Sequence, residues 1–328
     1  MSIQETKFKA IADAIRAKTG ETGMIVANDF ATKIAAIPTG VAKPSWVQST
    51  LPSRDYWQSV CYGDGKFVTV AYASSIAAYS TDGINWTQTT LPSNDSWQSV
   101  CYGNGKFVAI ANGSKTGAYS TDGITWTSMT MPGALSWFSI CYGNGKFVAI
   151  PDSSLLPAYS TDGINWTSAR MPVSASWNAV CYGNGKFVAV AYESAIAAYS
   201  TDGINWTQTT LPASSYWYSV CYGNGKFVAV ASSSKTGAYS TDGITWTSMT
   251  MFKSQSWYSV CYGNGKFVAV ASGYKTGEYS TDGISWSQTT LPPPGPWVSV
   301  CYGDGRFVTV AQGKDASAYI KDCFDSWD

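Results

Sequence analysis

The chain has 328 residues, of which only 13% are charged, and its 21 basic and 21 acidic side chains give a net charge of zero. This balance provides no electrostatic footprint for nucleic acid or for an anionic membrane surface. Histidine is absent, which removes the commonest general base, the Ser-His and Cys-His nucleophile pairs and the usual metal ligand.

The first 40 residues predict two short helices. Apolar residues recur at helical spacing over 8–15 and again over 30–37. Asn28 suits the N-cap of the second helix, which Pro38 and Gly40 end. Two helices of this size cannot form a stable core alone, so we expect this segment, residues 1–40, to attach to a partner or to oligomerise.

Residues 41–44 form a short linker to the rest of the chain. Met1 is not followed by a basic and then apolar stretch, so we expect no signal peptide and synthesis in the cytoplasm of the host cell. No apolar run approaches the ~20 residues of a membrane span. We therefore expect no membrane insertion.

From residue 45 onward the chain repeats with a period of 40 residues and no insertion or deletion. A Cys-Tyr-Gly tetrad completed by Asn or Asp opens at the same place in each repeat: Cys61, Cys101, Cys141, Cys181, Cys221, Cys261 and Cys301. A fixed period in this range indicates a repeat architecture, in which each repeat buries its apolar face against its neighbours. We number the repeats 1 to 7 from the Trp that begins each one, at residues 57, 97, 137, 177, 217, 257 and 297.

Each repeat predicts four short antiparallel strands. In repeat 1 these are 57–62, 67–71, 77–80 and 84–90, with an Asp-Gly signal for a tight hairpin after the first strand and a Thr-Asp-Gly turn after the third. Four strands in ~40 residues are typical of a β-propeller blade.

A second series of tryptophans fixes the number of blades and closes the ring. Fourth-strand Trp residues occur in six repeats, and the seventh lies upstream at Trp46, because 45–52 matches 85–92. The N-terminal strand then completes the blade that Trp297 begins, which leaves no open edge. We therefore predict an all-β, seven-bladed propeller over 45–328, with the tryptophans in its core. Residues 319–328 depart from the repeat, and Trp327 is not assigned.

The cysteines argue against disulfide and metal frameworks. Seven occupy one equivalent position, only Cys323 is extra, and C-x-x-C spacings are missing. We expect buried free cysteines that act as small hydrophobic residues, with no metal site.

The third turn resembles the Asp-box (BNR) repeat of sialidase-like propellers. In repeat 1 it reads Ser-Thr-Asp-Gly-Ile-Asn-Trp over 80–86, which is shorter than the family pattern by one residue between Asp and Gly. The resemblance implies a structural carboxylate that caps the turn and a Trp that packs inward. The six matching carboxylates are Asp82, Asp122, Asp162, Asp202, Asp242 and Asp282.

The same resemblance implies no catalytic residue and no cofactor. Sialidases need three arginines that converge on the substrate carboxylate, together with a Tyr/Glu pair. The repeats hold only Arg54, Arg170 and Arg306, and Arg306 follows a first hairpin turn on the wrong face. No arginine triad remains.

Residues 11–40 resemble the N-terminal segment of tail and baseplate proteins of phages that infect Gram-positive bacteria. The resemblance implies that residues 1–40 attach the chain to other phage tail proteins in the virion and that the propeller is distal. Fibres of this kind are commonly trimeric, which implies a homotrimer.

Sequence variation among the repeats falls on one face of the predicted ring. The links between repeats and the turns from second to third strand vary, whereas the other two turns scarcely change. The variable positions are rich in Tyr, Ser, Asn, Gly and Lys, as in antigen-binding loops. Drift in tolerant loops remains an alternative.

These variable positions supply the candidate ligand-binding residues, whose aromatic rings suit stacking on sugars. They are Arg54, Asp55, Tyr56, Tyr72, Phe138, Tyr192, Tyr216, Tyr218, Tyr258 and Tyr274. The first hypothesis is a non-catalytic phage receptor-binding module for a host-surface glycan or protein receptor. The second is a glycoside hydrolase of sialidase-like architecture with a carboxylate pair drawn from Asp55, Asp95, Asp152 and Glu193. The third is a purely structural module that contacts another virion protein.

Overall fold

The computed structural model describes residues 12–13, 16, 45–293 and 295–321. The chain divides into two compact units, and everything below concerns the unit Ser45–Asp322. Of the helical segment predicted in residues 1–40, only Ala12, Asp13 and Arg16 are described, and they are helical. The predicted hairpin, the linker 41–44 and Trp327 lie outside the described residues. No helix in the described ranges is long and apolar enough to cross a membrane.

The predicted all-β class is confirmed, because every regular element from residue 45 onward is a strand. The strands of the first half are β1 (Val47–Gly63), β2 (Lys66–Tyr72), β3 (Ser74–Ser80), β4 (Thr87–Asp95), β5 (Trp97–Gly103), β6 (Lys106–Ser120), β7 (Thr127–Gly143), β8 (Lys146–Pro151), β9 (Ala158–Ser160), β10 (Thr167–Ser168) and β11 (Trp177–Gly183). Those of the second half are β12 (Lys186–Ala191), β13 (Ser194–Ser200), β14 (Thr207–Gly223), β15 (Lys226–Ser232), β16 (Ser234–Ser240), β17 (Thr247–Gln255), β18 (Trp257–Gly263), β19 (Lys266–Ala271), β20 (Thr276–Ser280), β21 (Ser287–Thr290), β22 (Trp297–Gly303) and β23 (Arg306–Lys321).

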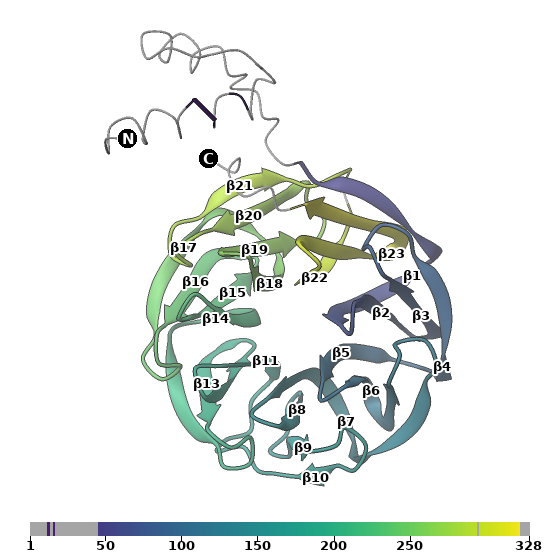
Figure 1. The fold of residues 1–328 in the computed structure, drawn as a ribbon. Coiled ribbons are helices and arrows are strands. Elements are labelled where there is room, and N and C mark those ends of the chain that lie inside the picture. The colour runs from purple at the N-terminus through teal and green to yellow at the C-terminus, as the bar shows by residue number, and fades with distance from the viewer. Residues whose placement is uncertain (1–11, 14–15, 17–44, 294, 322–328) are drawn as a thin grey trace, which may run out of the picture. The chain divides into compact units, whose positions relative to one another are not determined.

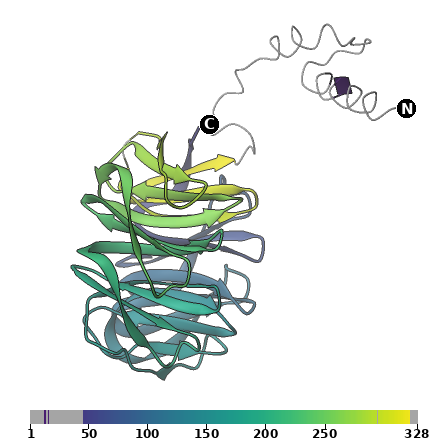
Figure 2. The same cartoon turned by 90° about the vertical axis from the view of Figure 1, so that its left-hand side faces the viewer.

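The strands of this unit are arranged as a ring, with the first strands of the repeats nearest its centre (Figure 1), and Figure 2 shows the same ring from the side. Neighbouring strands pair antiparallel in chain order. Some strands run on from the outside of one repeat to the inside of the next. β14, for example, pairs β13 through residues 207–215 and β15 through residues 216–223. Such strands join repeats into sheets of six, six, seven and four strands.

The first hairpin of each repeat turns on a left-handed residue. Asp64 has a φ of 46° and is followed by Gly65 with a φ of 70°. Two successive positive φ angles are the geometry of a type I′ turn, which Asn-Gly and Asp-Gly adopt most easily. This is why the Gly-Asn-Gly and Gly-Asp-Gly sequences vary so little among the repeats.

The Asp turn that follows the third strand delays the start of the fourth strand. The Asp82 carboxylate accepts hydrogen bonds from the amides of Ile84 and Asn85, at 2.9 and 2.8 Å, and from the Ser80 hydroxyl at 2.9 Å. The amides at 84 and 85 are therefore unavailable to the sheet. The predicted strand over 84–90 is wrong at its start, because β4 begins at Thr87.

The same hydrogen bonds set the charge state of this carboxylate. Burial alone would raise the pKa of Asp82, but the hydrogen bonds from Asn85, Ile84 and Ser80 outweigh it and hold the pKa well below its ordinary value. The pKa is likewise lowered at the five equivalent aspartates, to about 2 at Asp122. All six are therefore ionised at neutral pH.

Replacement of Asp162 by Ala is expected to lower the free energy of unfolding by about 1–2 kcal/mol at pH 7, because two backbone amides lose their acceptor. Since the folded-state pKa of Asp162 is depressed, this contribution is lost as pH falls below about 4. The difference between Asp162→Ala and the native protein should therefore shrink in acid. Urea unfolding at pH 7 and pH 3 measures it, with Thr161→Ala, whose side chain is exposed in the same turn, as the control.

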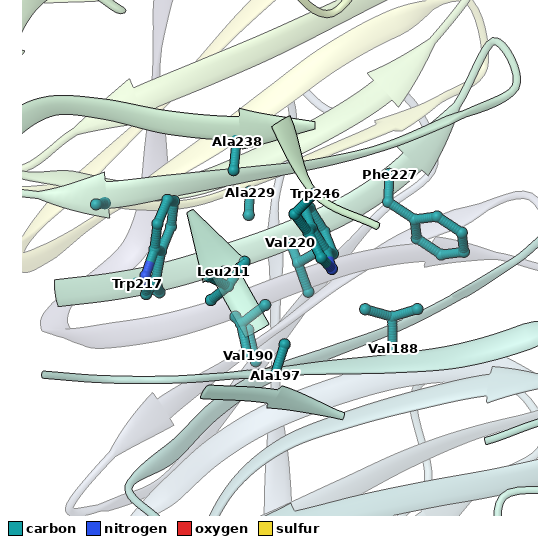
Figure 3. Close-up of a cluster of buried hydrophobic side chains, with 12 residues drawn as sticks. Val188, Val190, Ala197, Leu211, Trp217, Val220, Phe227, Ala229, Ala238 and Trp246 are labelled. Atoms are coloured by element: carbon teal, nitrogen blue, oxygen red, sulfur yellow. The ribbon is translucent and has the colours of Figure 1, made fainter. Parts of the chain in front are cut away.

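Core side chains pack between successive repeats, as the repeat architecture predicts. In the cluster of Figure 3, Val188, Val190 and Ala197 of repeat 4 meet Trp217 and Phe227 of repeat 5. The predicted core role of the first-strand tryptophans is confirmed, because all seven are fully buried. Each therefore contributes a large buried apolar area, ~150–250 Å² for a Trp side chain.

Repeats 7 and 1 meet through two contacts that recur around the ring: the approach of a hairpin Gly to a Tyr ring at every junction, and an amide-to-Ser hydrogen bond at all but the junction of repeats 4 and 5, where residue 179 is Ala. Gly303 lies so close to the Tyr62 ring that a Cβ added to it would be 2.1 Å from Tyr62 Cγ. Gly63 approaches Tyr102 of the next repeat in the same way, with a corresponding distance of 2.0 Å. The Val60 amide donates to Ser299 Oγ at 3.1 Å, as Val100 donates to Ser59 Oγ at 3.2 Å.

The N-terminal strand completes the last repeat as predicted. Residues 47–50 of β1 pair antiparallel with residues 316–319 of β23, and Val47 lies opposite Tyr319. Trp46 and Leu51, at the two ends of this segment, are buried. The chain's first and last strands therefore share one sheet.

The seven described cysteines are free thiols on the innermost strands. Cys61, Cys101 and Cys141 pack against hydrophobic clusters and keep only part of their surface exposed. Burial raises the pKa of each thiol far above its ordinary value. A neutral thiol among apolar side chains behaves as a small hydrophobic residue.

Candidate functional site

Hydrogen bonds assign the turns of each repeat to two faces. The side-chain amide of Asn104, in a first hairpin turn, donates to the Thr161 carbonyl in the Asp turn of the next repeat at 3.2 Å. Arg306 reaches the Asp82 carbonyl in the same way, at 2.5 Å. The first hairpin turn and the Asp turn, whose sequences scarcely change among the repeats, therefore share one face. On the opposite face the links between repeats contact the turns from second to third strand. The Asp152 amide, for example, donates to the Ser136 carbonyl at 2.8 Å.

The variable face holds a cavity of about 360 Å³, which we call the aromatic cavity. Its lining comes from repeats 3 to 6 and consists of Phe138, Asp152, Ser176, Asn178, Tyr192, Glu193, Tyr218 and Tyr258. A volume near 300 Å³ is at the small end of ligand pockets, so the cavity suits a group the size of one sugar ring.

A β-bulge on each first strand turns the residue that follows its Trp toward the ring's axis. The pairing register shifts between Trp217 and Ser219, so Tyr218 has no partner of its own on β15. The same shift occurs after each first-strand Trp. A bulge re-aims the unpaired residue. The residues at these positions line an axial cavity of about 130 Å³, together with the residue that follows each, which is Ser in six repeats and Ala179 in repeat 4.

Three tyrosines form adjoining walls of the aromatic cavity. The rings of Tyr218 and Tyr258 lie 4.2 Å apart between centroids, and those of Tyr192 and Tyr218 lie 6.2 Å apart at 81°. Tyr216 lies outside the lining and packs its ring on Tyr192 at 5.0 Å. Burial, reinforced by Tyr258, raises the pKa of the Tyr218 phenol well above its ordinary value, so the ring is neutral at physiological pH.

Polar side chains also line the aromatic cavity, and two of them make hydrogen bonds. The Asn178 side chain donates to the Tyr218 carbonyl at 2.7 Å, which ties repeat 4 to repeat 5. Asp152 accepts a hydrogen bond from the Ser153 hydroxyl at 2.9 Å. Glu193 is exposed and has a φ of 54°, a left-handed conformation that is uncommon for a residue other than Gly.

The structure thus brings together four of the predicted binding residues, Phe138, Tyr192, Tyr218 and Tyr258. Asp152 and Glu193 belong to the four carboxylates of the hydrolase hypothesis, and Ser176 and Asn178 occupy a link and the variable position after a first-strand Trp. Both carboxylates can be picked out by aligning the repeats, because no other repeat has an acidic side chain at either position.

The other predicted binding residues lie elsewhere. Arg54, Asp55, Tyr56 and Tyr72 gather where the first and last repeats meet: Arg54 Nε donates to the Gly313 carbonyl at 3.0 Å, and Tyr56 pairs with both Tyr72 and Gln312. Tyr56 is 57% exposed. Tyr274, which is 44% exposed, lies between β19 and β20 and does not line the aromatic cavity.

Two of the four carboxylates proposed for catalysis serve the turns instead. Asp55 accepts the Tyr56 amide at 2.7 Å and the Ser74 hydroxyl at 2.9 Å. Asp95 makes the equivalent bonds to Ser96 and Ser114, at 2.8 and 3.1 Å. Asp152 and Glu193 are the pair that the aromatic cavity brings together.

Comparisons with known proteins support the fold and go no further. No protein-family model matches the chain, and no curated protein matches it in sequence. A catalytically inactive variant of virginiamycin B lyase from Staphylococcus aureus, solved with quinupristin, is similar in structure with a TM-score of 0.77 at 11% identity, over 85% of this chain and 99% of that one. YCF48 bound to a peptide has a TM-score of 0.69 at 15% identity, over 86% and 98%. YCF48 from Cyanidioschyzon merolae has a TM-score of 0.65 at 13% identity, over 86% and 99%. These neighbours are β-propellers, and at such identities the likeness shows the fold alone.

Proposed function

We propose that this chain is a seven-bladed propeller that binds host-surface carbohydrate without chemical conversion. The observation that carries the proposal is the aromatic cavity, where rings from several repeats meet polar side chains on the variable face. Flat aromatic faces beside hydrogen-bonding groups suit the apolar faces and hydroxyls of sugars. The seven first hairpins and the closing contact of Gly303 with Tyr62 support the number of blades.

A binding role agrees with the chemistry that the chain lacks. One lyase neighbour is catalytically inactive when a histidine is replaced by alanine, and this chain has no histidine at all. The cysteine thiols are held in the neutral form by burial and therefore are poor nucleophiles. We propose accordingly that this protein is not an enzyme.

The proposed setting rests on residues 1–40. Their resemblance to phage tail and baseplate segments supports attachment to other virion proteins, in a homotrimer, with the propeller presented to a host receptor. A glycan or a protein receptor would then meet the variable face.

Binding to cell-wall glycans of Gram-positive bacteria, measured on a glycan array and by calorimetry, tests the carbohydrate proposal. Tyr218→Ala removes a ring from the aromatic cavity and is expected to weaken binding about 5- to 10-fold, because a stacked aromatic contact contributes on the order of 1–1.5 kcal/mol. Tyr274→Ala, an exposed aromatic on the same face, is the matched control and should bind as the native protein does.

An array on which the native protein binds no glycan contradicts the proposal. Equal losses in Tyr218→Ala and Tyr274→Ala would do so as well, because binding would then not involve the aromatic cavity. Thermal unfolding of each variant separates lost binding from lost folding.

Glycoside hydrolysis is the second candidate, favoured by the presence of both Asp152 and Glu193 in one cavity. A hydrolase would release reducing sugar from the glycan that it binds, and Glu193→Gln would abolish that release. Binding without any release of reducing sugar over hours supports the first proposal.

A further inference from the structure

The aromatic cavity differs from its surroundings in charge. Its eight lining residues include two carboxylates, Asp152 and Glu193, and no lysine or arginine. Yet the chain as a whole is neutral, and the same face carries Arg54 and Lys314 at the junction of repeats 1 and 7. Asp55, Asp95 and Asp315 also lie on this face, but Asp55 and Asp95 accept hydrogen bonds within their own turns. The aromatic cavity is where two carboxylates lie beside aromatic rings.

Both carboxylates break the repeat at neighbouring positions. Where repeat 3 has Asp152, the other repeats have Tyr, Asn, Ser or Gln, and where repeat 4 has Glu193 they have Ala, Gly or Ser. The backbone is left-handed at this position in all seven repeats: three carry Gly, among them Gly113 at 76° and Gly273 at 79°, while Ala73, Ser153 and Ser233 have φ angles of 53°, 52° and 57° beside 54° at Glu193. Repeat 4 is therefore the one in which this turn carries a charged side chain at that position.

The aromatic rings supply a second, independent attraction for positive charge. The face of an aromatic ring is negative, and a cation within about 6 Å of a ring centroid is attracted to it. Tyr192 and Tyr218 stand at 81° to each other, so a single group in the corner that they form can contact both rings, while Tyr258 packs on Tyr218 at 4.2 Å between centroids. Rings at right angles beside carboxylates form the geometry that recognises ammonium groups.

We propose that the aromatic cavity binds a positively charged nitrogen of its ligand, a primary or N-methylated ammonium group. The inference rests on the proposed carbohydrate-binding function and specifies its ligand class, an amine-bearing or choline-type glycan. Asp152 and Glu193 supply the opposite charge, and the three tyrosines desolvate and surround the cationic group.

Two pairs of small probes that differ mainly in charge test this inference. Choline is paired with 3,3-dimethyl-1-butanol, which has the same shape without the charge, and glucosamine is paired with N-acetylglucosamine. Ligand-observed NMR and calorimetry on the full chain are expected to show that the cation of at least one pair binds about 10-fold more tightly than its neutral partner. The pair that shows this preference tells N-methylated from primary amines. Raising the salt concentration to 0.5 M should reduce the preference.

Charge-neutralising variants identify the groups responsible. Glu193→Gln and Asp152→Asn are each expected to weaken binding of the cationic probe about 3- to 10-fold and to leave the neutral probe unchanged. Asp315→Asn removes an exposed carboxylate from another turn of the same face and should change neither. Because the Glu193 side chain is exposed, its variant is expected to fold as the native protein does.

The outcomes separate this inference from the proposed function. If neutral and cationic probes bind equally, or if Glu193→Gln and Asp152→Asn bind choline and glucosamine like the native protein, the inference is overturned, while glycan binding lost in Tyr218→Ala still supports the function. Choline binding without any glycan binding would overturn the function and support the inference. No binding to any small probe overturns the inference, and an array without any bound glycan overturns the function as well.

Discussion

A chain that begins at Pro52 is expected to lose cooperative folding, whereas one that begins at Ser45 should unfold like the full-length protein. The longer truncation removes the strand that pairs with residues 316–319 of β23 and the buried side chains Trp46 and Leu51. Burial of a Trp and a Leu contributes on the order of 5 kcal/mol, a large part of the stability of a typical domain. The loss also leaves β23 as an exposed edge, which invites aggregation. Thermal unfolding and size-exclusion chromatography measure both effects.

A circular rearrangement distinguishes loss of the strand from loss of a terminus. In this variant the chain runs from Pro52 to Tyr319, continues through a copy of the six-residue turn Ser80–Asn85, and ends with Trp46–Leu51. That order reproduces what the other repeats do between Tyr79 and Trp86. It is expected to restore cooperative unfolding. Failure to do so, or native stability in the chain that begins at Pro52, would show that β1 does not close the ring.

Much of the fold could be predicted because each repeat is locally consistent. Turn residues such as Asp64 and Gly65, alternating strands and buried tryptophans all favour the same hairpins. The start of the fourth strand could not be predicted from β propensity, since Ile84 and Trp86 are good strand residues. The Asp82 carboxylate accepts hydrogen bonds from the amides of Ile84 and Asn85. These amides therefore do not pair with β3, and the strand begins only at Thr87.

The site was predictable only in part, for a different reason. The variable positions that follow each first-strand Trp are visible in the sequence, but the bulge that turns Tyr218 and Tyr258 inward is not. Distances between repeats are also absent from the sequence. Tyr56 and Tyr218 are both aromatic and variable, yet only Tyr218 lines the cavity. Tyr218 occupies the bulge that follows its first-strand Trp, whereas Tyr56 precedes its Trp, and Tyr216, the equivalent of Tyr56 in repeat 5, also lies outside the lining.

One buried side chain makes the stability of the ring depend on pH. Glu278 is fully buried on β20, where the six other repeats have Ala. Its two carboxyl oxygens accept the amides of Phe252 and Lys253, at 3.0 and 2.7 Å. Burial raises the pKa of Glu278 to about 7, against the opposing effect of those amides and of Lys253 and Lys235. The acid is therefore partly protonated at neutral pH.

The sign of the pH dependence follows from that raised pKa. Between its ordinary value of 4.5 and about 7 the folded chain holds a proton on Glu278 that the unfolded chain releases. The favourable contribution is complete below pH 4.5 and is lost as pH rises through 7. The rise of the pKa from 4.5 to about 7 sets the upper limit of this loss at about 3 kcal/mol. Glu278→Gln cannot ionise, so its free energy of unfolding relative to the native protein should rise between pH 5 and pH 8 in urea titrations. A constant difference would contradict this account.

A double-mutant cycle shows why a carboxylate occupies this position. Residue 252 is Phe, whereas the equivalent residue in the other repeats is Pro, at 52, 92, 132, 172, 212 and 292. Proline has no amide hydrogen, so only this repeat presents a donor there, and only the neighbouring Glu278 accepts it. At pH 5, Glu278→Ala alone is expected to cost about 2–4 kcal/mol, because two partly buried amides lose their acceptor. Adding Phe252→Pro removes one of those donors and should recover about 1 kcal/mol, a coupling that independent sites would not show. Strictly additive effects would mean that Phe252 and Glu278 are not energetically coupled, and would contradict this explanation for the carboxylate.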